Sequence, residues 1–301
     1  MIIFDPLTVT DSNLTSSNIP EPDAGETIWV SGASVSIGDE RIRTQTHKVY
    51  RSLTGTNTTT PPEDDPTNWQ ELRPTNRYAM FDERNGTSST ETSSIVVTID
   101  AGKIINGLAG FNVTADAINV TVTDPIEGVV YNNDLPMRDS SLVVDYYTWC
   151  YTPIVFIDRF VLLDLPPYPN ATITITFTSA SGDVSVGNLC LGFQNSIGKT
   201  LMGTGLSGQD FSSVNRDEFG NYNIVERAQS DDVDFDIVIP RNQTNYFRSI
   251  LRSVRNRTTV FLGQTGETND PTLVYGFYVD YAITMQTKTL SFSTLSVEGV
   301  I

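Results

Sequence analysis

The chain has 301 residues, a length that indicates two or three domains, and only 18% of them are charged, below the usual quarter. Its formal net charge of −17 argues against binding nucleic acid through phosphates, because a basic footprint is absent. No apolar run approaches the roughly 20 residues that span a bilayer, and the first ten residues lack the features of a signal peptide. The polar, weakly charged composition favours a mainly β protein that inserts in no membrane.

The first 24 residues are polar after a short apolar start, and they contain Pro20 and Pro22. Chain termini of this kind are poorly ordered unless something ties them down. We therefore expect residues 1–24 to form an arm that becomes ordered only against a partner surface.

Residues 25–75 are expected to form a small β module that is too short to bury a large core. Strands are expected at residues 27–30 and 48–51, followed by a loop rich in Thr, Asn and Pro. Aromatic rings in such a module either fill a minimal core or offer stacking platforms to sugars. The three candidates for glycan contact are Trp29, Tyr50 and Trp69.

The two tryptophans are expected to differ in exposure. Trp69 follows the turn Pro66-Thr67-Asn68, where a ring can project from a loop. Trp29 lies within a strand and is expected to pack inward. If the module binds sugar, Trp69 is therefore the residue expected to carry the contact.

The order of these residues resembles the small carbohydrate-binding modules of chitinases and of bacteriophage virion proteins. In that pattern a Tyr-Arg-Ser/Ala-Leu strand precedes a Gly/Asn/Pro loop and a Pro-x-x-Trp turn, as residues 50–53 and 66–69 do here. The continuation PTNRYAMFD at residues 74–82 is similar to the phage tail-protein version. The resemblance implies a place in a virion and a candidate contact with glycans.

Residues 76–92 are expected to be a connector, and residues 93–205 an antiparallel β-sandwich. Repeated short strands separated by Gly, Pro, Asn and Asp are typical of that architecture, and residues 117–122 alternate strictly between apolar and polar. Further strands are expected at residues 95–99, 104–113, 158–163, 171–177 and 184–192.

Two parts of this region resemble the galactose-binding-like (discoidin-type) jelly roll. They are residues 104–112 with the alternating strand that follows, and the closing segment VSVGNL at residues 184–189. The resemblance implies a jelly-roll fold. It implies less about sugar binding, because many relatives of this fold bind protein or nothing.

Residues 206–301 are expected to form a C-terminal β module with one helix at residues 242–256. The helix is predicted from apolar residues at helical spacing, which should pack on a sheet. These residues are Tyr246, Phe247, Ile250, Leu251 and Val254. The segments 274–281 and 295–300 resemble the C-terminal module of phage tail-tip proteins.

No catalytic constellation stands out, and we expect neither an enzyme nor a cofactor or metal site. The single histidine, His47, has no serine elbow motif to serve. Paired carboxylates could in principle cleave a glycan, but no motif for an aromatic-lined cleft accompanies them. Calcium could bind such oxygens, although the EF-hand spacing is missing.

Charged residues suggest a contact between subunits. Asp232, Asp234 and Asp236 alternate with apolar residues and should share one face of a strand. Arg248, Arg252 and Arg255 lie on the expected helix. Two interpretations remain open: both rows are solvated faces, or the arginines of one copy meet the aspartates of another.

Cys150 and Cys190 lie in apolar, strand-like surroundings. A protein composed like an extracellular one, but without an export signal, fits a virion component made in the host cytoplasm. Because that compartment is reducing, we expect two buried free thiols and no disulfide.

The sequence thus predicts a bacteriophage virion structural protein of the tail, tail tip or neck. Its partners would be other virion proteins, copies of itself and, as a further candidate, a host-surface glycan. The competing hypothesis is a host-glycan-binding adhesin or a glycan-cleaving spike component.

Overall fold

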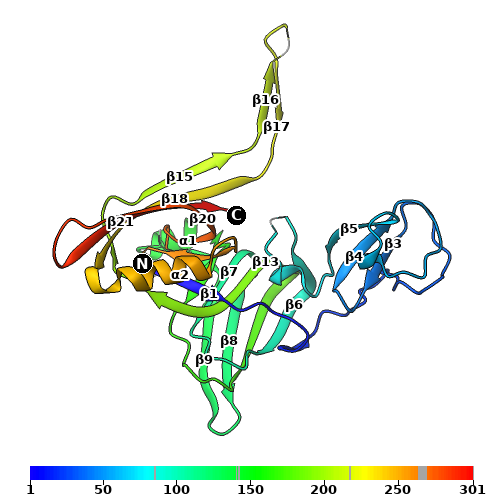
Figure 1. Cartoon of the computed structure of the whole chain (residues 1–301), viewed down its shortest axis with the longest axis horizontal. Coiled ribbons are helices and arrows are strands. Elements are labelled where there is room, and N and C mark those ends of the chain that lie inside the picture. The colour runs from blue at the N-terminus through cyan, green and yellow to red at the C-terminus, as the bar shows by residue number, and fades with distance from the viewer. Residues whose placement is uncertain (85, 140, 142, 217, 264–269, 301) are drawn as a thin grey trace.

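The computed structural model describes residues 1–84, 86–139, 141, 143–216, 218–263 and 270–300. The fold is mainly β, with 51% of the residues in strands and 9% in helices. It comprises a small N-terminal β module, a jelly-roll-like antiparallel β-sandwich, and a C-terminal β module with one long helix. Figure 1 shows the small module projecting at the right, the sandwich below, and a long hairpin rising from the C-terminal module.

One 25-residue strand, β13 (Thr172–Ser196), belongs to both sheets of the sandwich. Its first half pairs with β6 and β8, and its second half pairs with the start of β6 and with β7 and β1. The register shifts between Thr178 and Asp183, where Gly182 adopts a φ of 144° that favours glycine. The other strands of the sandwich are β2 (Leu14–Ser17), β6 (Ser89–Asp100), β7 (Gly107–Thr114), β8 (Ala117–Asp124), β9 (Gly128–Pro136) and β12 (Phe160–Leu162).

The sandwich core lies between these sheets. Strand β8 buries every second residue, as its sequence alternation predicts. Phe160 and Phe177 meet edge to face in this core, with ring centroids 6.3 Å apart. A second cluster underlies the long helix, and a third joins β1, β7 and β19.

The N-terminal segment is not an arm that waits for a partner, and this expectation is wrong. Strand β1 (Ile2–Pro6) lies between β13 and β19 (Thr259–Leu262) within one sheet. Ile3 and Phe4 are fully buried there. The short apolar segment at the N-terminus forms a central strand, because β13 and β19, from far along the chain, pair with its two edges. Strands β13, β1 and β19 connect the sandwich and the C-terminal module within one sheet. The sheet therefore marks no division between them, and the domain boundaries at residues 92 and 205 stay predictions.

The long helix packs as expected. Helix α2 (Thr244–Ser253) follows a 3₁₀ turn at Arg241–Gln243. The helical segment ends at Ser253, three residues before the predicted end at residue 256. Phe247, Ile250, Leu251 and Val254 are buried against the sheet, whereas Tyr246 is half exposed and donates its hydroxyl to Asn195 Oδ1. The strands under the helix are β18 (Gln229–Pro240), β20 (Val274–Thr284) and β21 (Leu290–Gly299), beside β1 and β19.

The small module has a three-stranded sheet and a core of its own. A 3₁₀ turn at Pro62–Asp64 interrupts its long loop, and a second at Ala79–Phe81 lies in the connector. The buried residues of its core belong to none of the other three clusters. Its strands are β3 (Glu40–Arg43), β4 (Lys48–Ser52) and β5 (Trp69–Pro74).

Two thin projections leave the body. One, here called the finger, is the hairpin in which β15 (Gly205–Asp210) pairs with the start of β18 and leads to the ribbon of β16 (Ser213–Arg216) and β17 (Tyr222–Val225). The other, here called the aromatic loop, is residues 143–156. It contains helix α1 (Tyr146–Tyr151) and β11 (Val155–Phe156), and β11 pairs with β10 (Arg138–Asp139). The short strand β14 (Lys199–Thr200) borders β18.

The cysteines correct one expectation. Both are free, but only Cys190 is buried in a strand, whereas Cys150 is exposed on α1. The aromatic residues around Cys150 are helical because Asp145 caps α1, accepting a hydrogen bond from the Thr148 amide at 2.7 Å. Burial raises the pKa of the Cys190 thiol to about 12.

Candidate interaction surfaces

The aromatic rings of the small module lie mainly in its hydrophobic core. Trp69 is 3% exposed and Tyr50 is 4% exposed, so the predicted exposure of Trp69 is wrong. The register pairs Trp69 with Ser52, which places its ring on the same face of the sheet as Tyr50. Its indole N–H donates to Thr58 Oγ1 at 3.2 Å. Glycan contact by these rings stays a prediction, but the ring expected to carry it is enclosed.

Trp29 is the half-buried ring, and an arginine lies over it. The Arg43 guanidinium lies 4.9 Å from the ring centroid and donates to both carboxylate oxygens of Glu63. Burial acts to raise the pKa of Glu63, but the hydrogen bonds and charge of Arg43 outweigh it and hold that pKa below its ordinary value. One face of Trp29 is therefore occupied by a cation rather than open for stacking.

The single histidine fastens the small module to the N-terminal segment. Its Nε2 lies 3.0 Å from Asp11 and its Nδ1 lies 3.0 Å from Glu21, and its ring stacks on Tyr78 with centroids 3.7 Å apart. Tyr78 donates its hydroxyl to Asp11 Oδ1 at 2.7 Å. This hydrogen bond contributes most to holding the pKa of Asp11 below its ordinary value, while burial and Asp11 raise the pKa of Tyr78.

The ring of His47 joins two segments of the chain through its two carboxylate partners. Among the described residues, the hydrogen-bond partners of its ring are the two carboxylates, with no serine or cysteine among them. A nucleophilic site needs such a group beside its base. The adjoining cavity of ≈ 550 Å³ is lined by the same His47 and Tyr78 together with Phe81 and Lys48.

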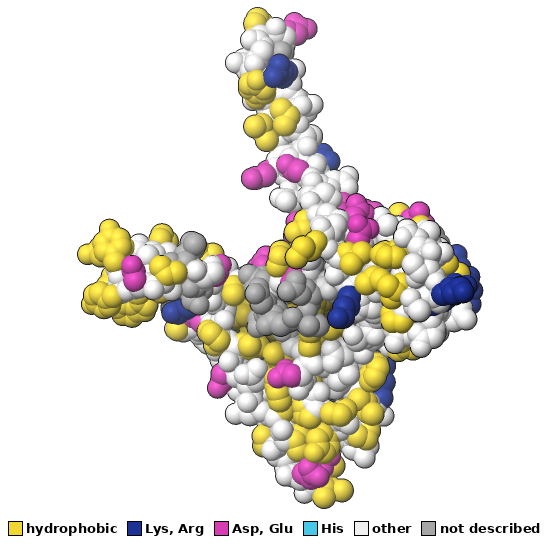
Figure 2. All heavy atoms as spheres, turned by 90° about the vertical axis from the view of Figure 1, so that its left-hand side faces the viewer, with side chains coloured by type: hydrophobic (Ala, Val, Ile, Leu, Met, Phe, Trp, Pro, Cys, Tyr) yellow, Lys and Arg dark blue, Asp and Glu magenta, His cyan; other side chains and the backbone are white. Residues whose placement is uncertain are grey.

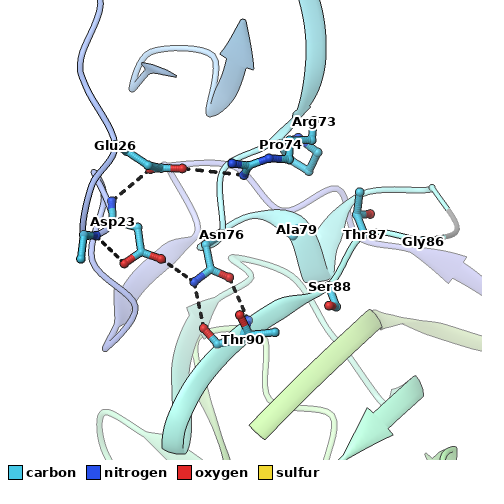
Figure 3. Close-up of a pocket in the computed structure, with 11 residues that line it drawn as sticks. Asp23, Glu26, Arg73, Pro74, Asn76, Ala79, Gly86, Thr87, Ser88 and Thr90 are labelled. Atoms are coloured by element: carbon cyan, nitrogen blue, oxygen red, sulfur yellow. Dashed lines mark hydrogen bonds and ion pairs between the residues drawn. The ribbon is translucent and has the colours of Figure 1, made fainter. Parts of the chain in front are cut away.

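A second cavity, of ≈ 440 Å³, lies where the module, the connector and β6 meet (Figure 3). Asn76 donates to Asp23 Oδ2 at 2.9 Å and to the Thr90 carbonyl at 2.8 Å, and its own carbonyl accepts from the Thr90 amide. Glu26 accepts from the Asp23 amide at 3.0 Å and lies 3.7 Å from Arg73. These polar groups suit sugar hydroxyls in type, but they already bind one another and so tie three segments together.

The two charged rows lie on different sides of the C-terminal module. Arg248, Arg252 and Arg255 are exposed, and within the described part of the chain their side chains form no ion pair. Val233, Phe235 and Ile237 of β18 are buried in the cluster that also holds the apolar stripe of α2. The aspartates alternating with them therefore lie on the opposite face of β18 from this core.

Two of those aspartates have hydrogen-bond partners within the chain. Asp232 Oδ1 accepts from the Gly299 amide at 3.1 Å, and Asp234 Oδ1 accepts from the Ser296 hydroxyl at 2.6 Å. Asp236 lines a shallow cavity beside Leu201. Because no arginine of the helix meets them in one copy, a charge contact between copies stays a prediction.

The aromatic loop gathers exposed apolar side chains, and the sequence did not indicate it as a site. The rings of α1 pack in pairs on one another, Tyr146 with Trp149 and Tyr147 with Tyr151. Each of these four side chains is at least 69% exposed. Figure 2 shows hydrophobic side chains gathered on this projection, at the left of the view, and again along the finger at the top. The signal that could have found it is four aromatic residues within six positions after a capping aspartate.

The described residues contain no group of three or more His, Cys, Asp or Glu side chains placed to hold a metal ion. None of their helices has the length and apolar character needed to cross a membrane.

No protein-family model matches this chain, and a search of curated proteins finds no match. The resemblances to carbohydrate-binding modules and phage tail proteins therefore rest on the sequence alone.

Proposed function

We propose that this chain is a structural protein of a bacteriophage particle, located in its tail, tail tip or neck. The observation that carries the proposal is the aromatic loop. Free soluble proteins rarely expose a contiguous apolar surface of that kind, whereas a subunit that works only in an assembly has such a surface covered by its neighbours. The sequence resemblances of residues 26–82 and 274–300 to phage tail proteins are the reason to propose that this assembly is a phage particle.

The small module supports an assembly role over adhesion. A sugar-binding module needs an open aromatic shelf, but Trp69 is enclosed and Trp29 lies under Arg43. The module is also tied to the body through His47 and Asn76. A module with buried aromatic rings and a fixed connection to the body is suited to holding one position beside other subunits.

Immunogold labelling of purified phage particles from the lysates in which the chain is made tests this proposal. We expect gold at one fixed position on the tail or neck, and no label when the antibody is first absorbed with purified chain. A chain that stays in the soluble fraction while intact particles carry none of it would overturn the proposal.

The adhesin hypothesis is tested with the same purified chain on a glycan array. We expect no glycan to bind. If binding occurs and is lost in Trp29→Ala, the module is an adhesin despite its covered ring.

A further inference from the structure

We propose that copies of this chain associate head to tail, with the aromatic loop of one copy docking on the apolar face of the finger of the next. The inference deepens the proposed function, because it names the partner as a second copy of this chain. Its test uses the purified chain in solution, so its failure is distinguishable from absence of the chain from phage particles.

The aromatic loop alone offers nearly the area that a specific protein interface needs. Five rings take part: Tyr146, Tyr147, Trp149 and Tyr151 are 69–79% exposed, and Phe156 is 55% exposed. An aromatic side chain buries about 150–250 Å², so these exposed fractions leave on the order of 500–900 Å² to cover. A standard interface buries about 800 Å² on each partner. The exposed area of the loop therefore approaches that of one side of a stable contact.

The finger carries a second apolar face, set by its register. Val214 lies opposite Ile224, and Arg216 lies opposite Tyr222, so these four side chains share one face of the ribbon. The Arg216 guanidinium lies 4.6 Å from the Tyr222 ring centroid and donates to its hydroxyl at 2.7 Å. Val214, Ile224 and Tyr222 are each about 60% exposed.

The ribbon also gains from being covered. β16 and β17 pair only with each other in the described structure. A two-stranded hairpin without a further layer is marginally stable in water. A partner that packs on Val214 and Ile224 would supply the missing layer.

Charge favours these two faces as the point of contact. Copies that each carry −17 repel one another, so association is least opposed where few charges approach. From residue 143 to 156 the loop contains one charged residue, Asp145, whose carboxylate is engaged in capping α1. Of the four side chains that form the finger face, Arg216 is the charged one, and it stacks on Tyr222.

The two faces cannot cover each other within one copy. The loop leaves the sandwich and the finger leaves the C-terminal module, and Figure 2 shows them projecting in different directions from the body. A loop-to-loop contact would leave the finger uncovered. A head-to-tail contact covers both with one repeated interface, which closes into a ring when its rotation permits.

Two surface variants and one control test the contact by sedimentation velocity over a range of concentrations. The loop variant is Tyr146→Gln with Trp149→Gln, which keeps a helix-forming residue at both positions. The finger variant is Val214→Thr with Ile224→Thr, which keeps β-branched residues in the ribbon. The matched control is Ile126→Gln, an apolar side chain that is 92% exposed on the turn between β8 and β9. Circular dichroism and thermal melts establish that all three fold as the parent does.

We expect the parent and the control to associate as concentration rises, and each double variant alone to associate at least about tenfold more weakly, since aromatic and apolar anchors dominate interfaces. An equimolar mixture of the two variants should form a 1:1 dimer that does not grow, because each supplies the face that the other lacks.

A mixture that stays monomeric would overturn the proposal, as would a finger variant that dimerises alone while the loop variant does not, the pattern of a loop-to-loop contact. A parent that stays monomeric would also overturn it. If that parent instead bound phosphatidylcholine vesicles or immobilised glycans through Trp149, the loop would serve another class of partner.

Discussion

The small module and the sandwich are stabilised in different ways. Three buried residues form the core of the module, against 24 between the sheets of the sandwich. In contrast, ten of the 13 ion pairs of the described structure have their basic partner between Arg41 and Arg84. The module therefore depends on very few rings and on charge, whereas the sandwich depends on buried apolar area. Changes to rings, charge or pH should affect the module first.

The largest effect is expected from Trp69→Ala. Truncating a fully buried aromatic side chain costs about 3–5 kcal/mol, and in a core of three residues no neighbour can fill the space. Hydrogen exchange followed by mass spectrometry should show faster exchange in β3, β4 and β5 and unchanged exchange in β8 and β13. The control, Trp149→Ala, removes an exposed ring and should leave the module as it is. Uniformly faster exchange along the chain would show that the module and sandwich unfold as one unit.

A smaller loss is expected from Arg43→Ala. It removes the cation over Trp29 and the forked contact with Glu63, together about 1–2 kcal/mol. The matched control is Arg51→Ala, whose ion pair with Glu40 is nearly half exposed and should contribute only a few tenths of a kcal/mol. Chemical denaturation followed by tryptophan fluorescence in a Trp149→Phe background reports on the module alone, because the chain has three tryptophans. If Arg43→Ala and Arg51→Ala lowered the unfolding free energy equally, the contact of Arg43 with Trp29 would have no special role in stability.

Acid should weaken the module before the sandwich. Burial acts to raise the pKa of Glu71, but hydrogen bonds from Lys48 and Arg84 outweigh it and hold the pKa below the ordinary 4.5, as Arg43 does for Glu63. Because the folded pKa is the lower one, the stability from these pairs is present above about pH 4.5 and is lost as the pH falls through the folded value. Melts at about pH 6 and about pH 3, followed by the same fluorescence for the module and by differential scanning calorimetry for the sandwich, should show the melting temperature of the module falling further than that of the sandwich. Parallel shifts of both transitions would argue against this origin.

The smallest effect on stability is expected at the cysteines. In the native protein Cys150 should react with a maleimide at once, whereas Cys190 should react only after unfolding, because it is buried and its thiol pKa is raised to about 12. Labelling Cys150 should change the unfolding free energy by less than about 0.5 kcal/mol. Titration of the denatured, unreduced chain should find two thiols. Finding none would mean that the two cysteines are bonded.

The sequence predicted those parts of the fold that depend on local periodicity. The alternation in β8 and β18 indicated strands with one buried face, and the spacing of Phe247 and Leu251 indicated the helix and its buried side. It did not predict β1, because nothing in the apolar start of the chain says that strands from residues 192–196 and 259–262 will flank it.

The candidate sites were harder to predict, because exposure depends on register and on capping. Trp69 is buried because it pairs with Ser52 on the face that carries Tyr50, which the preceding turn does not reveal. The sequence around Cys150 predicts strand-like surroundings, but the hydrogen bonds between Asp145 and Thr148 make this segment a helix. Because the segment is helical, its rings lie away from the core and form an exposed apolar surface on the projection.

The position of β1 sets an order in time for the folding of the chain. Ile2 pairs with both Ser196 and Leu262, so the N-terminal strand cannot find its second neighbour until that part of the chain has been synthesised. At about 5–20 residues per second, Leu262 follows β1 from the ribosome by roughly 10–50 s. Throughout that interval Ile3 and Phe4 lack the sheet that finally encloses them. Translation that stopped before Thr259 would therefore leave a defect at the opposite end of the molecule, around its first residues.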